Sequence, residues 1–288
     1  MRLVSFRGAD GPRIGVVQED GVIDLTEVDA SAPRTIADAI REERLDSLAD
    51  LAAKADASNR LNYDELDFEL PIADPGKILC LGLNYMDHVN EGPFNRPDFP
   101  AIFMRSATSL VPHGKPIIRP LQSETMDYEA ELALIIGKKS RHLTADNALD
   151  AIAGYSCFND GSVREYQRHT IQWTMGKNFD QTGPFGPVFV TPDELPVAAD
   201  GLKIECRLNG ETVQSSTTDM MIFKVVETLI YITEGLTLEP GDVIMMGTPS
   251  GVGHARKPPL WMRDGDTVEI DIEGIGVLRN PIQDDVAS

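Results

Sequence analysis

The sequence predicts a mixed α/β fold rich in β-strands, with a small N-terminal α/β domain before a larger rolled or sandwiched sheet. Apolar runs of strand length recur through most of the chain, whereas helical patterns are few. Residues 71–76 carry two prolines and a glycine, a composition that resists regular structure and is typical of a connector. We therefore expect two domains, residues 1–72 and residues 73–288.

The composition is that of a soluble globular protein, with 42% hydrophobic and 25% charged residues. Acidic residues outnumber basic ones by 46 to 26, and the net charge of -20 opposes binding to nucleic acids and anionic membranes. No apolar run approaches the roughly 20 residues that span a bilayer, and the first residues lack the apolar segment of a signal peptide. We expect a cytoplasmic protein with free, buried thiols at its three scattered cysteines, Cys80, Cys157 and Cys206.

The N-terminal domain begins as a meander of short strands and continues as a helical pattern. Glycine-bearing polar turns separate three strand patterns, at residues 3–6, 13–17 and 21–25. From Pro33 to about Ala55 the apolar residues recur at helical spacing, and proline suits the first turn of a helix.

The larger domain is predicted from many strand-like runs and one clear helix. The helix covers residues 219–234 and is followed by Gly235, a common stop signal. The expected strands are residues 77–82, 101–105, 128–136, 154–159, 188–190, 202–208, 242–246, 267–272 and 276–278.

A pair of glutamates, Glu129 and Glu131, stands out within residues 127–136, which we interpret as one strand. Side chains alternate along a strand, so the two carboxylates share a face and lie about 7 Å apart. The other face is apolar throughout, which favours a partly buried pocket over a solvated surface. Two carboxylates on one wall can converge on one cation, although a solvated strand edge is the commoner origin of such a pair.

Asp160 supplies a third carboxylate, because it follows the apolar run at residues 153–158. The alternative is an ordinary turn, for which Asp-Gly is a common signal. Together with Glu129 and Glu131 it would form an all-oxygen set that suits Mg²⁺, Mn²⁺ or Ca²⁺. Three protein ligands would leave positions open for a substrate.

His88 and Glu91 are three residues apart and would share one face of a helical turn at residues 84–91. A carboxylate there would orient the imidazole and raise its basicity, which makes His88 a candidate general base for water. The alternative is an exposed pair without a catalytic role. The remaining histidines have no comparable partner, and we expect structural roles for His113, His142, His169 and His254.

Several further residues could bind an anionic substrate. Lys177 has apolar and aromatic neighbours on both sides and could hold a carboxylate or polarise a carbonyl, unless it is an exposed loop lysine. Arg164 and Gln167 could add donors. The strand before residues 247–253 runs into a glycine-rich loop that lacks the ending of a nucleotide P-loop, and Thr248 offers a hydroxyl there.

Five segments, in the order in which they occur, resemble the fumarylacetoacetate hydrolase family, and the resemblance extends over roughly residues 77–281. Each is weak alone, but the ordered set is specific. The segments are Leu83-Asn84-Tyr85-Met86-Asp87-His88-Val89-Asn90-Glu91, Tyr128-Glu129-Ala130-Glu131-Leu132, Asn159-Asp160-Gly161-Ser162-Val163-Arg164-Glu165-Tyr166-Gln167, Gly176-Lys177-Asn178-Phe179-Asp180 and Gly247-Thr248-Pro249-Ser250-Gly251-Val252-Gly253.

The resemblance implies a mixed β-roll that forms a homodimer and binds Mg²⁺ or Mn²⁺. It also implies a catalytic His-Glu dyad on a mobile lid. The residues that would carry these roles are Glu129, Glu131 and Asp160 for the metal, His88, Glu91 and Lys177 for catalysis, and Tyr85, Arg164, Gln167 and Thr248 for the substrate.

The first hypothesis for the activity is hydrolysis of a carbon–carbon bond in a 2,4-diketo acid of the acylpyruvate type. His88, assisted by Glu91, would activate water, and the metal would hold the charge of the departing pyruvate-like enolate. A rival uses the same enolate to decarboxylate or tautomerise an oxaloacetate-like or 2-hydroxy-dienedioate acid. Paired carboxylates also suit a glycosidase, against which the 6% aromatic content speaks. A keto-acid-binding protein without catalysis is a further alternative.

Overall fold

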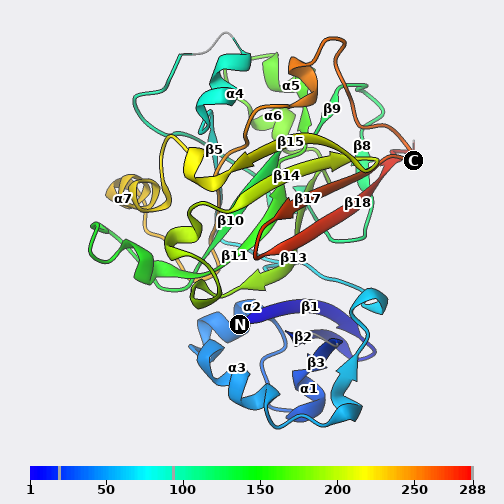
Figure 1. The fold of residues 1–288 in the computed structure, drawn as a ribbon, viewed down its shortest axis with the longest axis vertical. Coiled ribbons are helices and arrows are strands. Elements are labelled where there is room, and N and C mark those ends of the chain that lie inside the picture. The colour runs from blue at the N-terminus through cyan, green and yellow to red at the C-terminus, as the bar shows by residue number, and fades with distance from the viewer. Residues whose placement is uncertain (19–20, 93–94, 287–288) are drawn as a thin grey trace.

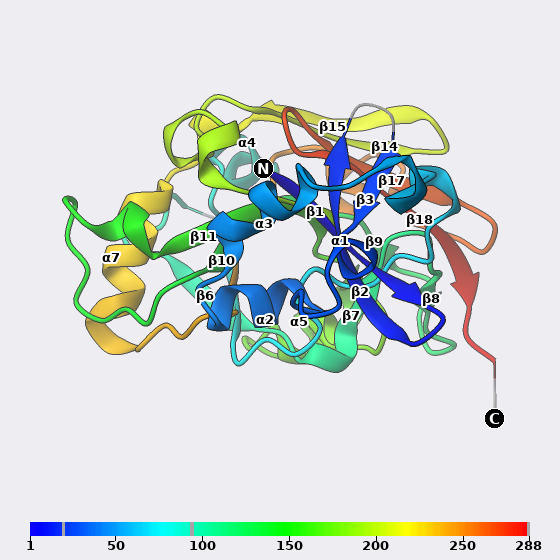
Figure 2. The same cartoon turned by 90° about the horizontal axis from the view of Figure 1, so that it is seen from below.

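The computed structural model describes residues 1–18, 21–92 and 95–286, and it confirms a mixed, β-rich fold. Strand residues make up 35% of the chain and helical residues 24%. Two sheets are stacked in the larger part, and the N-terminal strands lie with α1–α3 at one end of the molecule (Figure 1). Figure 2 shows that end face on, with β1–β3 beside the three helices.

The larger sheet joins the N-terminal unit to the rest of the chain. Strand β1 pairs antiparallel with β13, with Arg2 opposite Val190, so the N-terminal meander extends the same sheet. The predicted boundary between two domains at residue 72 therefore stays a prediction. In spatial order the strands are β4 (Arg60–Leu61), β3 (Gly21–Asp24), β2 (Gly11–Gln18), β1 (Arg2–Gly8), β13 (Gly183–Val190), β11 (Ile152–Asn159), β10 (Ala130–Ile136), β16 (Val243–Met245), β5 (Ile78–Gly82) and β6 (Ala101–Met104), with β7 (Leu110–Pro112) also on β13.

A five-stranded sheet covers one face of the larger sheet. Leu132 and Leu134 of β10 pack in one apolar cluster with Ile204 and Ile270 of this second sheet. On the other face of β10, Ala133 and its neighbours belong to a second apolar cluster, so this strand is buried on both sides. The strands of the second sheet are β15 (Glu211–Thr217), β14 (Lys203–Leu208), β17 (Thr267–Ile272), β18 (Gly276–Asp284) and β8 (Ile117–Arg119).

Helices are short, and among the described residues none is both long and apolar enough to cross a membrane. They are α1 (Leu25–Val28), α2 (Ile36–Arg41), α3 (Leu45–Ala52), α4 (Met86–Glu91), α5 (Arg164–Arg168), α6 (Thr174–Lys177) and α7 (Val225–Gly235). Helices α4, α5 and α6 lie at the end opposite the N-terminal unit (Figure 1). Cys80, Cys157 and Cys206 are free and buried, as predicted.

Two predicted elements are interrupted, and a third begins later than expected. The strand expected over residues 127–136 is two pieces, because β9 (Met126–Asp127) pairs with β12 (Ser162–Val163) and β10 begins at Ala130. The helix expected from Pro33 to Ala55 breaks between α2 and α3, where Glu43 has a φ of 55°.

The helix expected over residues 219–234 begins later, at Val225. The backbone N–H of Phe223 donates to Oδ1 of Asn84 at 2.8 Å, and that of Ile222 donates to the Asn84 carbonyl. These contacts with a distant segment hold residues 222–223 outside the helix. Gly235 is its last residue and not the stop after it.

Candidate active site

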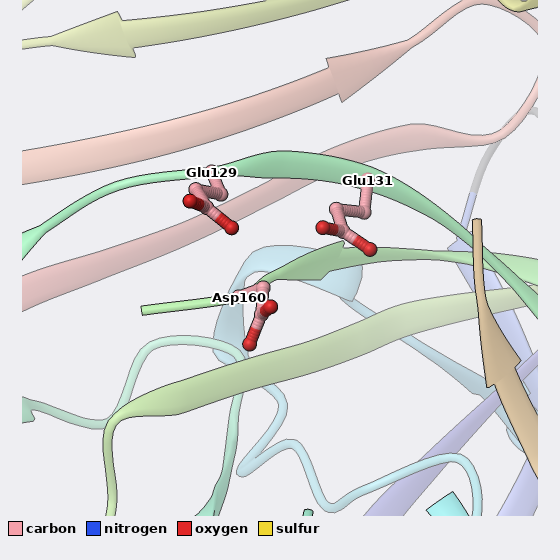
Figure 3. A group of neighbouring side chains, drawn as sticks. All are labelled: Glu129, Glu131 and Asp160. Carbon is pink, nitrogen blue, oxygen red and sulfur yellow. The ribbon is translucent and has the colours of Figure 1, made fainter. Parts of the chain in front are cut away.

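Three buried carboxylates form the floor of the site. One oxygen from each of Glu129, Glu131 and Asp160 lies within 4.8 Å of the others, and the side chains converge in Figure 3. Glu131 lies on β10, Glu129 in the gap just before it, and Asp160 directly after β11. Because β10 and β11 are antiparallel neighbours, the backbone N–H of Asp160 donates to the carbonyl of Glu129 at 2.9 Å. Sheet register therefore brings the distant Asp160 to the glutamate pair.

Backbone N–H groups fix the two glutamates further. The N–H of Glu129 donates to Oδ1 of Asn159 at 2.9 Å, and the N–H of Gly247 donates to Oε2 of Glu131 at 2.9 Å. Gly247 has a φ of +86°, and a Cβ there would lie 2.8 Å from the Cβ of Asn84. Only glycine fits both the conformation and the space. The glycine-rich loop thus supports Glu131 through its backbone.

Cationic side chains surround two of the three carboxylates. Nζ of Lys177 lies 2.7 Å from Glu129 and 2.6 Å from Asp160. Arg164 contacts Glu129 with Nη2 at 2.6 Å and Asp127 with Nε at 2.8 Å. On the far side of Asp160, the buried guanidinium of Arg105 donates to its Oδ1.

These charges shift the pKa values of the floor in opposite directions. Burial disfavours the charged form of Glu129, but Lys177 and Arg164 outweigh it and hold its pKa well below the usual range. Burial, with the negative charges of Asp160 and Glu129, raises the pKa of Glu131 well above its usual range. Burial opposes the charge of Lys177, yet Asp160 and Glu129 raise its pKa.

The floor fits a divalent cation. Its ligand atoms are all carboxylate oxygens, the kind that Mg²⁺ and Mn²⁺ prefer. Among the described residues Glu131 has no cationic partner and accepts only the N–H of Gly247. A cation bound among the three oxygens would supply the missing positive charge. The buried Glu-Glu-Asp cluster could therefore hold a divalent metal.

Helix α4 contributes His88 and Glu91 to the pocket that contains this floor, and we call it the lid. Nδ1 of His88 lies 3.3 Å from Oε2 of Glu91, so the predicted pairing is present. The other Glu91 oxygen accepts the N–H of Gly251 at 2.7 Å, and Asp87 accepts the hydroxyl of Ser250 at 2.8 Å. The lid is thus attached to the same glycine-rich loop that supports Glu131.

One pocket gathers all but one of the predicted site residues: His88, Glu91, Glu129, Glu131, Asp160, Arg164, Gln167, Lys177 and Thr248. The exception is Tyr85, which is fully buried and does not line the pocket. It precedes the first residue of α4, and its hydroxyl has no hydrogen-bond partner in the described part of the chain. Its side chain belongs to the main apolar cluster, so its contact with a substrate stays a prediction.

Four polar residues at the site escaped the sequence analysis. Arg105 supports Asp160, and Asp127 accepts bonds from Arg164 and from the N–H groups of Gly253 and His254. His254 and Arg168 line the pocket. A signal existed for His254, which we expected to be structural, because it directly follows the glycine-rich loop. Arg105 stands alone after an apolar run, and its partner is 55 residues away.

Comparisons with known proteins agree with this geometry. The family model described as "Fumarylacetoacetate (FAA) hydrolase C-terminal" matches residues 77–283. A mitochondrial oxaloacetate tautomerase of Homo sapiens is 39% identical over 290 residues, which cover 98% of this chain and 91% of the relative. A solved fumarylacetoacetate hydrolase from Exiguobacterium antarcticum is similar with a TM-score of 0.86 and 36% identity, covering 99% of this chain and all of the other. A solved 5-carboxymethyl-2-hydroxymuconate delta-isomerase from Mycobacterium smegmatis has a TM-score of 0.77 and 29% identity, with coverage of 99% and 100%.

The expected cytoplasmic location is wrong by this comparison, because the human relative and others like it are named as mitochondrial proteins. The inference failed for a physical reason. A missing long apolar segment speaks against insertion into a membrane, and it does not distinguish one aqueous compartment from another.

Proposed function

This chain belongs to the fumarylacetoacetate hydrolase family, and we propose that it is a metal-dependent tautomerase of an oxaloacetate-like 2-keto acid. The observation that carries the proposal is one pocket that unites the acid floor with the His88–Glu91 pair. The name of the human tautomerase, similar over 98% of this chain, and that of the solved isomerase favour tautomerisation over the hydrolysis that we considered first.

In the proposed reaction a proton leaves the enol oxygen and an equivalent proton is gained at the adjacent carbon. Glu129, Glu131 and Asp160 would hold a divalent cation, Mg²⁺ or Mn²⁺, which would supply positive charge that stabilises the enolate. His88 is the group that moves the proton at the carbon, and Glu91 orients its imidazole through Nδ1. Thr248 and Gln167 line the pocket and position the substrate.

Lys177 contributes charge at the floor of the site. Its ammonium contacts Glu129 and Asp160 at 2.7 and 2.6 Å, and the two acids keep it protonated because they raise its pKa. A fixed positive charge there favours the enolate over the neutral ketone. Lys177 therefore acts by electrostatics and not as a base.

The second candidate is cleavage of a 2,4-diketo acid in the same pocket, which the name of the solved Exiguobacterium hydrolase favours. The reaction products distinguish a tautomerase from a hydrolase and from a decarboxylase. A tautomerase consumes the enol, which is measured as a loss of the enol's ultraviolet absorbance. It releases neither CO₂ nor a second acid. A hydrolase releases a carboxylic acid beside pyruvate from an acylpyruvate, and a decarboxylase releases CO₂. Loss of the activity with a chelator and its return with Mg²⁺ or Mn²⁺ would identify the metal.

We also propose that the protein is a homodimer, as the family resemblance implies. Sedimentation equilibrium would give twice the chain mass of 31.5 kDa. A mass equal to that of one chain would contradict the proposal.

A further inference from the structure

One arginine at the pocket has no acidic partner. Besides two histidines, the pocket is lined by two arginines and one lysine, Arg164, Arg168 and Lys177. Two of them are held by buried carboxylates, as described above. Arg168 has no ion pair and no hydrogen bond with any side chain in the described part of the chain. Its charge is therefore available to a ligand.

Helix geometry directs Arg168 to the same pocket as Arg164. The two residues are four apart on α5, so they lie on one face of the helix. Arg164 faces inward to the acid floor, whereas Arg168 is exposed at the pocket rim. Burial of part of the side chain and the like charge of Arg164 lower the pKa of Arg168. An anion bound beside Arg168 would offset the repulsion between the two guanidinium groups.

Gln167 adds a second free donor beside Arg168. Its carbonyl oxygen accepts Nη1 of Arg164 at 3.0 Å, and its NH₂ group has no partner among the described residues. The chain has 46 acidic residues, so an acidic partner was widely available for this arginine. None of the described acidic residues forms an ion pair with it, which favours a partner that comes with the substrate.

We infer that Arg168, together with the amide of Gln167, binds the distal carboxylate of a dicarboxylic 2-keto acid whose other end lies at the acid floor. The inference deepens the proposed function and rests on it for the orientation of the substrate. The planar guanidinium matches the two oxygens of a carboxylate. Arg168 would thus select dicarboxylic acids over monocarboxylic acids of the same kind.

The test compares the binding of malate and lactate to the Mg²⁺-loaded protein by calorimetry. Both are unreactive 2-hydroxy acids, and only malate carries a distal carboxylate. The wild type should bind malate at least about tenfold more tightly than lactate. Arg168→Gln should remove most of that preference and leave the affinity for lactate within about twofold. Arg168→Lys, which keeps the charge, should fall between the two.

Arg141→Gln is the matched control, because this exposed arginine lies outside the pocket. It should keep the wild-type preference. The inference would be overturned if the wild type showed no preference for malate, or if Arg168→Gln kept the preference unchanged. It would also be overturned if Arg168→Gln lost affinity equally for malate and lactate. Because the measurement needs no turnover, a protein that fails as a tautomerase but keeps the Arg168-dependent preference would refute the proposed function alone.

Discussion

The floor and the lid of the pocket are built in different ways. On the floor, Glu129, Glu131 and Asp160 are at most 5% exposed and are held by buried cations and backbone N–H groups. On the lid, the side chains of His88 and Glu91 are 12% and 24% exposed, and their nitrogen–oxygen distance is 3.3 Å. The floor is assembled from distant segments of the sheet, whereas the lid is a single helix of six residues.

The difference indicates a division of labour. Buried charges need fully satisfied partners, and such a network fixes the position of each oxygen. A short helix with few buried contacts belongs to the parts of a protein that open most easily. The floor is thus suited to hold a metal and a chelated substrate, and the lid to bring a proton-transfer group and to let the substrate enter.

Glu131→Gln should have the largest effect, because it removes the floor ligand that lacks its own cation. We expect Mg²⁺ affinity to fall by more than the roughly 10- to 100-fold typical of residues that only support a ligand, and turnover to be lost. Calorimetric titration with Mg²⁺ measures the first and enol consumption the second. Glu211→Gln, on an exposed position of β15, is the matched control. An unchanged Mg²⁺ affinity in Glu131→Gln would contradict metal binding at the floor.

His88→Ala should come next and should affect chemistry alone. A positioned acid–base group contributes about 10²- to 10⁴-fold, and we expect a loss in that range in kcat. Mg²⁺ affinity should stay within about twofold, since His88 is not among the three converging ligands. A comparable loss of metal affinity would show that the lid and the floor are not separate.

Arg105 tests whether the floor depends on its supporting charges. Its Nη1 binds Asp160 and the Gly161 carbonyl, and Nη2 binds Thr182 at 3.0 Å. Breaking a buried ion pair typically costs about 3–5 kcal/mol, so Arg105→Met should lower the melting temperature strongly in a chelator. Mg²⁺ should narrow the gap to the wild type, because a bound cation compensates Asp160.

Arg105→Lys is the control for that experiment, since it keeps the charge but not the planar set of donors. It should lose less stability than Arg105→Met, and Mg²⁺ should narrow its gap to the wild type by less, because the retained lysine charge already compensates Asp160. If the gap in melting temperature were the same with Mg²⁺ and with a chelator, Arg105 would stabilise the fold without supporting the metal ligand.

The sequence was sufficient to indicate which residues lie together at the candidate site where each group follows a local pattern. Glu129 and Glu131 are two residues apart, Asp160 ends an apolar run, and His88 and Glu91 share a helical turn, so spacing alone indicates each group. The same approach predicted a β-rich fold because apolar alternation follows the strands. It could not detect the gap at residues 128–129, where the alternation continues although β9 pairs with another strand.

The sequence was not sufficient where a role depends on tertiary contacts. Arg105 acts through Asp160 and Thr182, and no spacing rule connects residues so distant in the chain. Tyr85 belongs to a matching segment, but spacing does not show that its side chain is fully buried outside the pocket lining. Arg168 is notable because it has no side-chain partner among the described residues, which only the folded chain reveals.

Ser250→Ala should have the smallest effect and tests the lid attachment. It removes the hydroxyl that donates to Asp87 at 2.8 Å, while the bond from Gly251 to Glu91 remains. A single hydrogen bond contributes about 0.5–1.5 kcal/mol, so hydrogen exchange in residues 86–91 should rise by up to about tenfold. Mg²⁺ affinity should not change, and Ser47→Ala, on the distant helix α3, should alter neither. Should Ser250→Ala weaken Mg²⁺ binding without faster exchange in α4, the loop would serve the floor and not the lid, and the two regions would have to be regarded as one.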